Sequence, residues 1–371
     1  MARRKNIEVT PDKVSPHTIK KFELIEKYVK DWAPKLLNYP NCKGIVFIDC
    51  MCNSGIYNDY LDKKVVGTPI RVAAYLADTM KTYPNKQAHL YFNDLSAEKI
   101  EVLKTRLPAD ANNFHITTRI GDGNDLLKTI RATNISHTHY LLVYDPNQAS
   151  IDWVALSPFL RNWGEVIINH MVSDSIRGVS QAKSDATKAK YAQTYGAPVE
   201  SLLTFRGKRD AYEKRIQKII TMLSTQTGKR YIAPFPFFNK KNSLVYNLIH
   251  CSGHIAGFKL FKKTAWKTFG GKSSTKNTYG NEKQPELDFN GTGELNTMTD
   301  EYCYYVKDIA KFIHDSFIGQ QNVSLSEVWR LLDDHPTFPS DGYKPEIKKE
   351  LKDIYRDIVS KKSITFTKRR A

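Results

Sequence analysis

The sequence has few cysteines and no long apolar run, and each absence excludes a class of protein. No apolar run approaches the roughly 20 residues that a membrane-spanning helix needs, and the basic N-terminus lacks the apolar segment of a signal peptide. The five cysteines are odd in number and include no Cys-x-x-Cys pair, so neither a disulfide framework nor a typical zinc site is expected. We therefore expect reduced thiols, no structural metal, no membrane contact and a cytoplasmic location.

Two phosphate-binding signatures are missing from the turn that follows the first predicted strand, residues 50–57. This turn contains neither the Gly-x-Gly-x-x-Gly motif of dinucleotide-binding folds nor the Gly-x-x-x-x-Gly-Lys-[Ser/Thr] motif of P-loop enzymes. Chemistry on a nucleoside triphosphate is therefore disfavoured. A cofactor without a pyrophosphate needs no helix N-terminus close to it, so such a cofactor is compatible with the turn.

Four apolar runs that each end at or near an aspartate dominate the first half of the chain. Each is rich in β-branched or aromatic residues, as is typical of buried parallel strands. The runs are Ile45–Asp49, Leu90–Asp94, the segment from Phe114 to Asp122, and Tyr140–Asp145. Helical patterns separate them, so the sequence predicts right-handed βαβ units and a Rossmann-like α/β sheet. The acids should gather at the carboxyl edge of this sheet, where open α/β folds bind ligands.

The predicted sheet is preceded by a helical segment and followed by a smaller unit. We expect an N-terminal helical segment over residues 1–43, and a Rossmann-like domain over 44–269 with a basic helical insertion near 172–226. A flexible linker is expected over 270–299. Residues 300–371 show three helical patterns and one short strand with a basic end, a small helical module that resembles a winged helix. The insertion should cover the carboxyl edge as a substrate lid.

Basic residues outnumber acidic ones by 56 to 39, which gives a formal net charge of +17. The excess is uneven, because residues 179–241 contain 13 basic and four acidic residues, and residues 258–281 contain six lysines and no acid. Aromatic side chains are interleaved with these cations, as in proteins that stack unpaired bases over a neutralised backbone. Nucleic acid, DNA or RNA, is therefore the predicted partner, and a merely solvated basic surface is the alternative.

A single glycine after an acidic strand end is compatible with S-adenosylmethionine (SAM) as the cofactor. SAM needs a tight turn beside its methionine moiety, a carboxylate on its ribose hydroxyls and polar cover for its adenine. We expect Ser54 and Gly55 to form the turn, Asp94 to bind the ribose and Asp122 to cover the adenine. Asp94 could instead serve only as an N-terminal acid of the next helix. The expected cofactor-binding residues are Asp49, Asn53, Ser54, Gly55, Asp94, Gly121 and Asp122.

In these segments and their order, the chain resembles the three-Cys-motif partner (TcmP) proteins and, through them, the class I SAM-dependent methyltransferases. The resemblance spans residues 20–267 and has several short components. They are the helix start at 20–28, the strand and turn at 49–57, Gly67-Thr68-Pro69, Asn93-Asp94, Gly121-Asp122, Asp145-Pro146, the Val245-Tyr246 strand and the segment 254–266. The resemblance implies a class I methyltransferase fold with SAM as cofactor. It also implies a three-Cys-motif protein, similar to radical-SAM proteins, as a partner.

The turn after the fourth predicted strand is the expected catalytic segment, with Asp145, Pro146 and Asn147 as its residues. The Asp145 carboxylate and the backbone carbonyls that follow can accept hydrogen bonds from an amino or hydroxyl nucleophile, and the proline stiffens the turn. Two features depart from the family. Gln148 stands where amino-methylating enzymes carry an aromatic residue that stacks on a flipped base. Cys52-Asn53 replaces the alanine-glycine step of the first turn.

Two classes of function therefore stay open. The acids at the strand ends favour a SAM-dependent methyltransferase that acts on nucleic acid or a nucleic-acid-associated substrate. The two departures favour a non-catalytic nucleic-acid-binding partner of a three-Cys-motif protein. A nuclease is disfavoured, because no single predicted strand carries a paired-aspartate or Glu-x-Lys motif. Asn169 and His170 end the fifth predicted strand and are candidates for lining the pocket.

Overall fold

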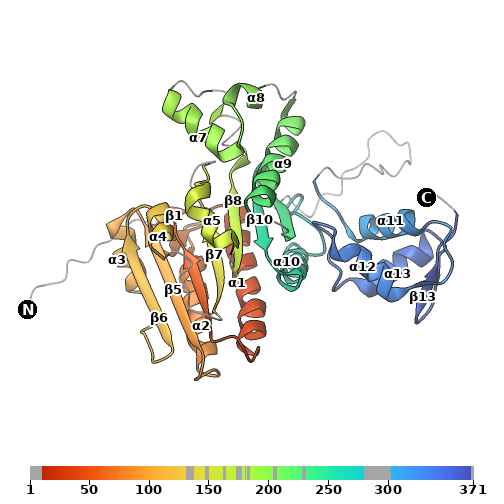
Figure 1. Ribbon diagram of the computed structural model, residues 1–371, viewed down its shortest axis with the longest axis horizontal. Helices are drawn as coiled ribbons and strands as arrows, with labels where there is room; N and C mark the ends of the chain where they lie inside the picture. Colours follow the sequence, from red (N-terminus) through yellow and green to blue (C-terminus); the bar gives the residue numbers. More distant parts are fainter. Residues whose placement is uncertain are drawn as a thin grey trace, which may run out of the picture.

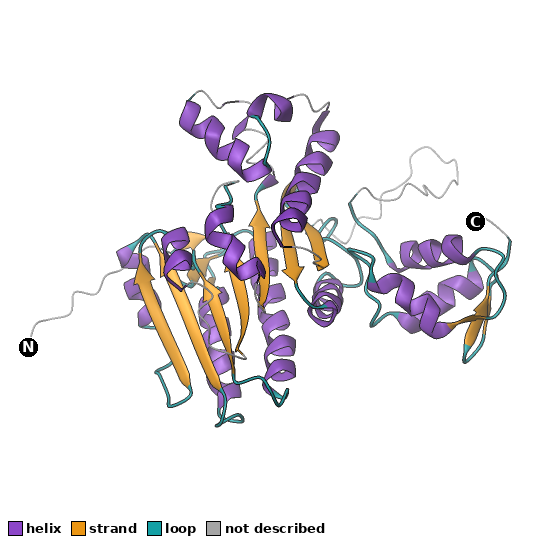
Figure 2. Cartoon of the chain, in the orientation of Figure 1, coloured by secondary structure: helices purple, strands orange, loops and turns teal. Residues whose placement is uncertain are grey.

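The computed structural model describes residues 11–130, 138–146, 150–161, 164–172, 178–179, 181, 184–203, 207–227, 231–279 and 302–368. Its centre is a seven-stranded sheet in the order β6-β5-β2-β7-β8-β10-β9 (Figures 1 and 2). The strands are β2 (Gly44–Asp49), β5 (Gln87–Asp94), β6 (Phe114–Ile120), β7 (Thr138–Tyr144), β8 (Gly164–His170), β9 (Tyr231–Phe238) and β10 (Leu244–Ser252).

The strand directions confirm the predicted α/β class. β6, β5, β2, β7 and β8 are parallel to one another. β10 enters between β8 and β9 and runs antiparallel to both of them. A parallel sheet with one antiparallel strand inserted near an edge is the topology of the class I methyltransferases that the sequence resembles. The fold is therefore Rossmann-like and methyltransferase-like.

Strand β2 shows how the sequence buries both faces of this sheet. All six of its residues are buried. Ile45 and Phe47 belong to one apolar cluster, whereas Val46 and Ile48 belong to a second cluster on the opposite face. Because successive side chains of a strand point to opposite faces, an unbroken apolar run requires helices on both sides.

The helices supply that cover. One face carries α1 (Pro16–Leu37), α2 (Thr68–Met80), α3 (Ala97–Lys104) and α10 (Ile255–Thr268). The other carries α4 (Gly123–Ile130), α5 (Trp153–Arg161), α7 (Asp185–Tyr195), α8 (Val199–Leu203) and α9 (Gly207–Thr227). None of the helices in the described part of the chain is long and apolar enough to cross a membrane.

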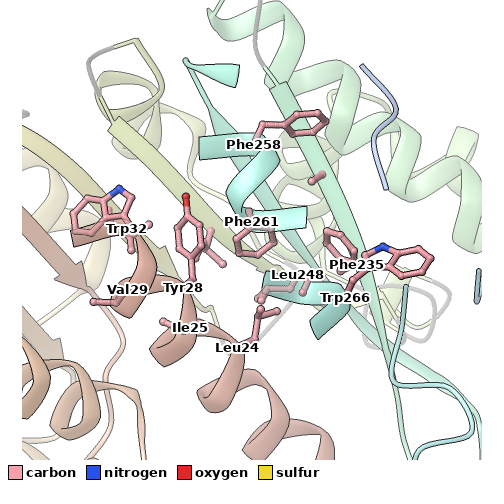
Figure 3. Close-up of a cluster of buried hydrophobic side chains, with 14 of the residues drawn as sticks. Leu24, Ile25, Tyr28, Val29, Trp32, Phe235, Leu248, Phe258, Phe261 and Trp266 are labelled. Carbon is pink, nitrogen blue, oxygen red and sulfur yellow. The ribbon is translucent and has the colours of Figure 1, made fainter. Parts of the chain in front are cut away.

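Helix α1 packs its apolar stripe against α10 and the last two strands. The stripe recurs at helical spacing and is buried, with Leu24, Ile25, Tyr28, Val29 and Trp32 as members. Figure 3 shows these side chains grouped with Phe258, Phe261 and Trp266 of α10, Phe235 of β9 and Leu248 of β10. This contact holds the N-terminal helix on the sheet.

Helices α7, α8 and α9 occupy the region where the sequence predicts a helical insertion, and Figure 1 shows them beyond the end of β8. Their buried side chains, including Leu202, Ile219 and Leu223, join the apolar cluster of that face. The Tyr195 hydroxyl lies 2.8 Å from Nε2 of His170, the last residue of β8. The insertion is thus packed on the carboxyl edge of the sheet.

Residues 302–368 form a small unit of three helices and three short strands. In chain order these are α11 (Val306–Phe317), β11 (Val323–Ser324), α12 (Leu325–Asp333), α13 (Lys344–Asp353), β12 (Ile358–Val359) and β13 (Ser363–Thr365). The strands pair in the order β11-β13-β12. Helix α13 ends at Asp353, and Arg356 adopts a left-handed conformation (φ 59°) before the chain enters β12.

The first ten residues of the expected linker, 270–279, pack on the sheet. Ser274 and Thr275 are fully buried. The Thr275 hydroxyl oxygen accepts a hydrogen bond from the Phe238 amide at 2.7 Å, which closes the edge of β9. These residues extend the core instead of forming a free connection. Residues 280–301 lie outside the described part.

Candidate active site

A cavity of about 360 Å³ opens at the carboxyl ends of β2, β5, β6 and β7. Its position and size are those of small-molecule sites in open α/β sheets. It is lined by Cys50, Met51, Asn53, Asn93, Asp94, Leu95, Lys99, Gly121, Asp122, Gly123, Asn124, Tyr144, Pro146, Ser150 and Lys190. Five residues of the predicted site are in this lining, namely Asn53, Asp94, Gly121, Asp122 and Pro146.

The turn after β2 places Asn53 in a left-handed conformation and is fixed by contacts with Asp12. Asn53 has φ 59°, which asparagine tolerates better than most residues. Its amide Nδ2 donates to Asp12 Oδ2 at 2.8 Å, and Lys99 Nζ donates to the same oxygen at 2.7 Å. The hydrogen bond from Lys99 and, to a smaller extent, the one from Asn53 lower the pKa of Asp12. The Asp12 carboxylate therefore links Asn53 in this turn to Lys99 of α3.

Asp94 ends β5 and is fixed by two backbone donors. Its Oδ2 accepts from the Asn53 amide at 2.9 Å, and its Oδ1 accepts from the Ser96 amide at 2.9 Å. Ser96 is the N-cap of α3, so Asp94 also has the local role of an acid at a helix N-terminus. Because each carboxylate oxygen has a second lone pair, Asp94 can still accept hydrogen bonds from a ligand in the cavity.

Asn93, beside Asp94, joins three strand ends. Its Nδ2 donates to the backbone oxygens of Cys50 at 3.1 Å and Gly121 at 2.8 Å. Its Oδ1 is buried and has no hydrogen-bond partner among the described residues. A buried acceptor left in this state costs about 1–3 kcal/mol. A ligand that donates a hydrogen bond here would remove that cost.

Asp122 follows β6 and lies exposed at the mouth of the cavity. Its Oδ1 accepts from the amides of Asn124 at 2.7 Å and Asp125 at 3.3 Å, which caps the start of α4. A Cβ on Gly123 would lie 2.5 Å from the Cys50 carbonyl oxygen. Glycine there lets α4 approach the turn after β2, and so positions Asp122 beside it.

Ser54 and Gly55 shape the first turn but do not line the cavity. Ser54 is buried and its hydroxyl donates to the Ile56 carbonyl at 3.0 Å. Gly55 has φ 70°, and a Cβ there would lie 2.8 Å from Ile70 Cδ1. Their role in holding the methionine moiety of SAM stays a prediction.

Asp145, which follows β7, is bound by residues distant in sequence. Its Oδ2 pairs with the buried ammonium of Lys21 from α1, and its Oδ1 accepts from the Asn169 side-chain amide of β8. Lys21 Nζ also lies 5.4 Å from the centre of the Tyr246 ring. The Asp145 carboxylate is thereby oriented and its charge is balanced. Asn147 lies outside the described residues.

Asp49, the last residue of β2, is buried and does not line the cavity. Burial, followed by the nearby charge of Asp145, raises the pKa of Asp49 to about 7. Burial and the same two acids raise the pKa of the Tyr57 phenol. Lys21, the ion-pair partner of Asp145, offsets part of this rise in the pKa of Asp49.

His170 does not face the cavity as a titrating base. Its Nε2 lies beside the Tyr195 hydroxyl, and burial, with Arg215 nearby, lowers the pKa of His170 to about 3. The ring is therefore neutral at physiological pH. Asn169, the other candidate from the end of β8, contributes by holding Asp145.

Sequence reasoning did not assign roles to Asp12, Lys21, Asn93 or Lys99. Lys21 lies 124 residues from its partner Asp145, and Asp12 lies 41 residues from Asn53. Asn93 did carry a signal, since it adjoins the acid at a strand end. Among the described residues, no group of three or more histidine, cysteine or acidic side chains is arranged to hold a metal ion.

No protein-family model matches the chain, and no curated protein matches its sequence. Similar solved structures include a Legionella pneumophila protein of the DUF519 family, 11% identical, covering 69% of this chain and 93% of that one with a TM-score of 0.41. Human methyltransferase-like protein 13 in complex with SAH is 9% identical (67% and 91% covered, TM-score 0.34). Cofactor-bound Rv0187 from MTB is 12% identical (66% and 84% covered, TM-score 0.33).

Proposed function

We propose that this protein is a SAM-dependent methyltransferase acting on nucleic acid or a nucleic-acid-associated substrate. The observation that carries the proposal is the cavity at the carboxyl edge of a sheet with methyltransferase topology, lined by Asp94 and Asp122. The resemblance to class I methyltransferases in the order of the strand-end motifs supports it. Membership of the TcmP family, and with it a three-Cys-motif partner, belongs to the same proposal.

The chain's residues fit the parts of SAM. Asp94, oriented by two backbone amides, would accept hydrogen bonds from the ribose hydroxyls. Asn93 Oδ1 offers a buried acceptor with no partner among the described residues. Gly121 and Asp122 would border the adenine at the cavity mouth. When bound, SAM supplies an electrophilic methyl group on a sulfonium.

Asp145 would position the nucleophile of the substrate. Pro146, the next residue, lines the cavity, so an amino or hydroxyl group entering there comes close to the turn after β7. Lys21 and Asn169 fix the Asp145 carboxylate before the substrate arrives. Such preorganisation supplies much of the acceleration in an in-line displacement.

One observation favours the second candidate, a nucleic-acid-binding partner without catalysis. Both carboxylate oxygens of Asp145 are already engaged, one of them in an ion pair with a buried lysine. An acid held in this way also serves to anchor α1 on the sheet. The two candidates differ in whether methyl groups are transferred.

Transfer of labelled methyl groups from SAM to DNA, RNA and protein fractions separates the two candidates. The methyltransferase proposal predicts label in the nucleic-acid fraction and a rate lower on the order of 100-fold in Asp145→Asn, since positioning and proton acceptance are lost. Asp78→Asn, whose side chain is 81% exposed on α2, is the matched control. SAM binding without label in any fraction would favour the second candidate.

A further inference from the structure

The C-terminal unit carries a basic groove between α13 and the β12–β13 hairpin. The groove encloses about 560 Å³ and is lined by Pro345, Lys348, Lys349, Lys352, Val359, Ser360 and Lys361. Four of these seven residues are lysines, and none is acidic or aromatic. The groove is separate from the cofactor cavity and shares no residue with it.

Helix α13 divides its side chains into three stripes. Ile347 and Leu351 are buried in the core of the unit. Pro345, Lys348, Lys349 and Lys352 follow the i, i+3, i+4, i+7 spacing of a single helix face and line the groove. Glu346, Glu350 and Asp353 share the remaining face. The face of α13 that points toward the hairpin therefore carries only positive charge, although the helix as a whole also contains acidic residues.

The order of elements around the groove gives it a docking geometry. The unit runs α11, β11, α12, α13, β12, β13, so α13 follows α12 as the second helix of a helix–turn–helix pair does, here across a ten-residue connection (334–343), and the hairpin stands beside it. In helix–turn–helix proteins this second helix enters the major groove of DNA. Here Lys361 and Lys362 lie in the hairpin turn, both exposed, next to that helix.

We propose that this groove binds duplex DNA, with α13 in the major groove and the hairpin lysines on the phosphate backbone. B-DNA has a major groove wide enough for an α-helix, whereas that of A-form RNA is too narrow for side chains to read. Single strands are usually held by aromatic side chains that stack on bases, and none lines this groove. The surface therefore suits a duplex backbone better than unpaired bases.

The test compares two lysine pairs on the same unit of the full-length protein. Lys349→Ala/Lys352→Ala removes two groove cations, and Lys307→Ala/Lys311→Ala removes two exposed cations from α11, outside the groove. Fluorescence anisotropy with a labelled duplex of about two helical turns gives the dissociation constant over a range of salt concentrations. Circular dichroism checks that both variants are folded.

The proposal predicts duplex binding that weakens on the order of tenfold or more in the groove variant. The slope of log affinity against log salt concentration should fall by about 1.8, or about 0.9 for each of two phosphates that the missing lysines would neutralise. The α11 variant should bind within about twofold of the parent, because its lysines do not reach the phosphates. Equal weakening in both variants, tighter binding of a single strand or RNA duplex, or no binding would each overturn it. SAM titration of the groove variant reports on the cofactor cavity separately.

Discussion

Asp49 shows how a single buried carboxyl couples this site to pH. Its folded-state pKa of about 7 lies above the ordinary value of 3.8. Between these values the folded protein keeps a proton that the unfolded chain releases, so the free energy of unfolding falls as pH rises from about 4 to 7. At pH 8 Asp49 is therefore ionised in a poorly solvated region close to the Asp145 carboxylate.

Asp49→Asn should remove this pH dependence. We expect the variant to be more stable than the parent by about 2–4 kcal/mol at pH 8 and by much less at pH 4.5, since only the ionised form of Asp49 is penalised. Urea unfolding at the two pH values measures the difference. The same pH dependence in both proteins would show that Asp49 is solvated or paired differently.

At the level of secondary-structure elements, Lys21 joins α1 to the end of β7. The side chain is buried and makes an ion pair with Asp145, whose own side chain is 25% exposed. Removing one member of such a pair leaves the other charge without compensation, whereas removing both is much less costly. The apolar stripe of α1 in Figure 3 holds the helix on the sheet in either case.

Lys21→Met should therefore lower the free energy of unfolding by roughly 2–4 kcal/mol, and Lys21→Met/Asp145→Asn should recover most of it. A double-mutant cycle by denaturant unfolding tests the coupling. Additive losses would mean that the two side chains do not interact in solution. Lys20→Met, whose partner Glu23 lies one turn away on the helix surface, is the control.

The sequence was sufficient for the elements that repeat a strong local pattern. The apolar run Ile45–Asp49 predicts β2, since a strand that is buried on both faces is apolar along its whole length, and every residue of β2 is buried. The order of the strand-end acids predicts the edge of the sheet at which the cavity opens. Lys21 and Asp12 could not be predicted, since their partners are brought near only by the tertiary fold. β11 and β12, two residues each, are too short to show any periodicity.

At the scale of the whole molecule, the C-terminal unit is joined to the sheet through α10. Lys262, fully buried, donates to the backbone oxygens of Leu332 at 2.9 Å, Asp333 at 3.2 Å and His335 at 2.7 Å. Trp266 Nε1 donates to the Thr337 oxygen at 2.8 Å. These contacts satisfy the end of α12 and the loop after it, so the unit is held against α10, beside which Figure 2 shows it.

Lys262→Met should loosen this junction, because three buried carbonyls lose their donor at a cost of about 1–3 kcal/mol each when no water replaces it. We expect faster amide hydrogen exchange over residues 325–337 and little change over β2 and β5. Lys263→Met, on the exposed side of the same helix, is the control. Equal exchange in the two variants would show that the unit is held by its apolar contacts alone.

The central claim, that the cavity at the carboxyl edge binds SAM, is tested most directly by calorimetric titration of the full-length protein with SAM and SAH. We predict saturable binding in the micromolar range that weakens by about 1.5–3 kcal/mol in Asp94→Ala, the worth of hydrogen bonds to a charged group. Asp78→Ala should bind as the parent does. Absence of binding to either compound by the folded protein, or unchanged affinity in Asp94→Ala, would contradict the claim.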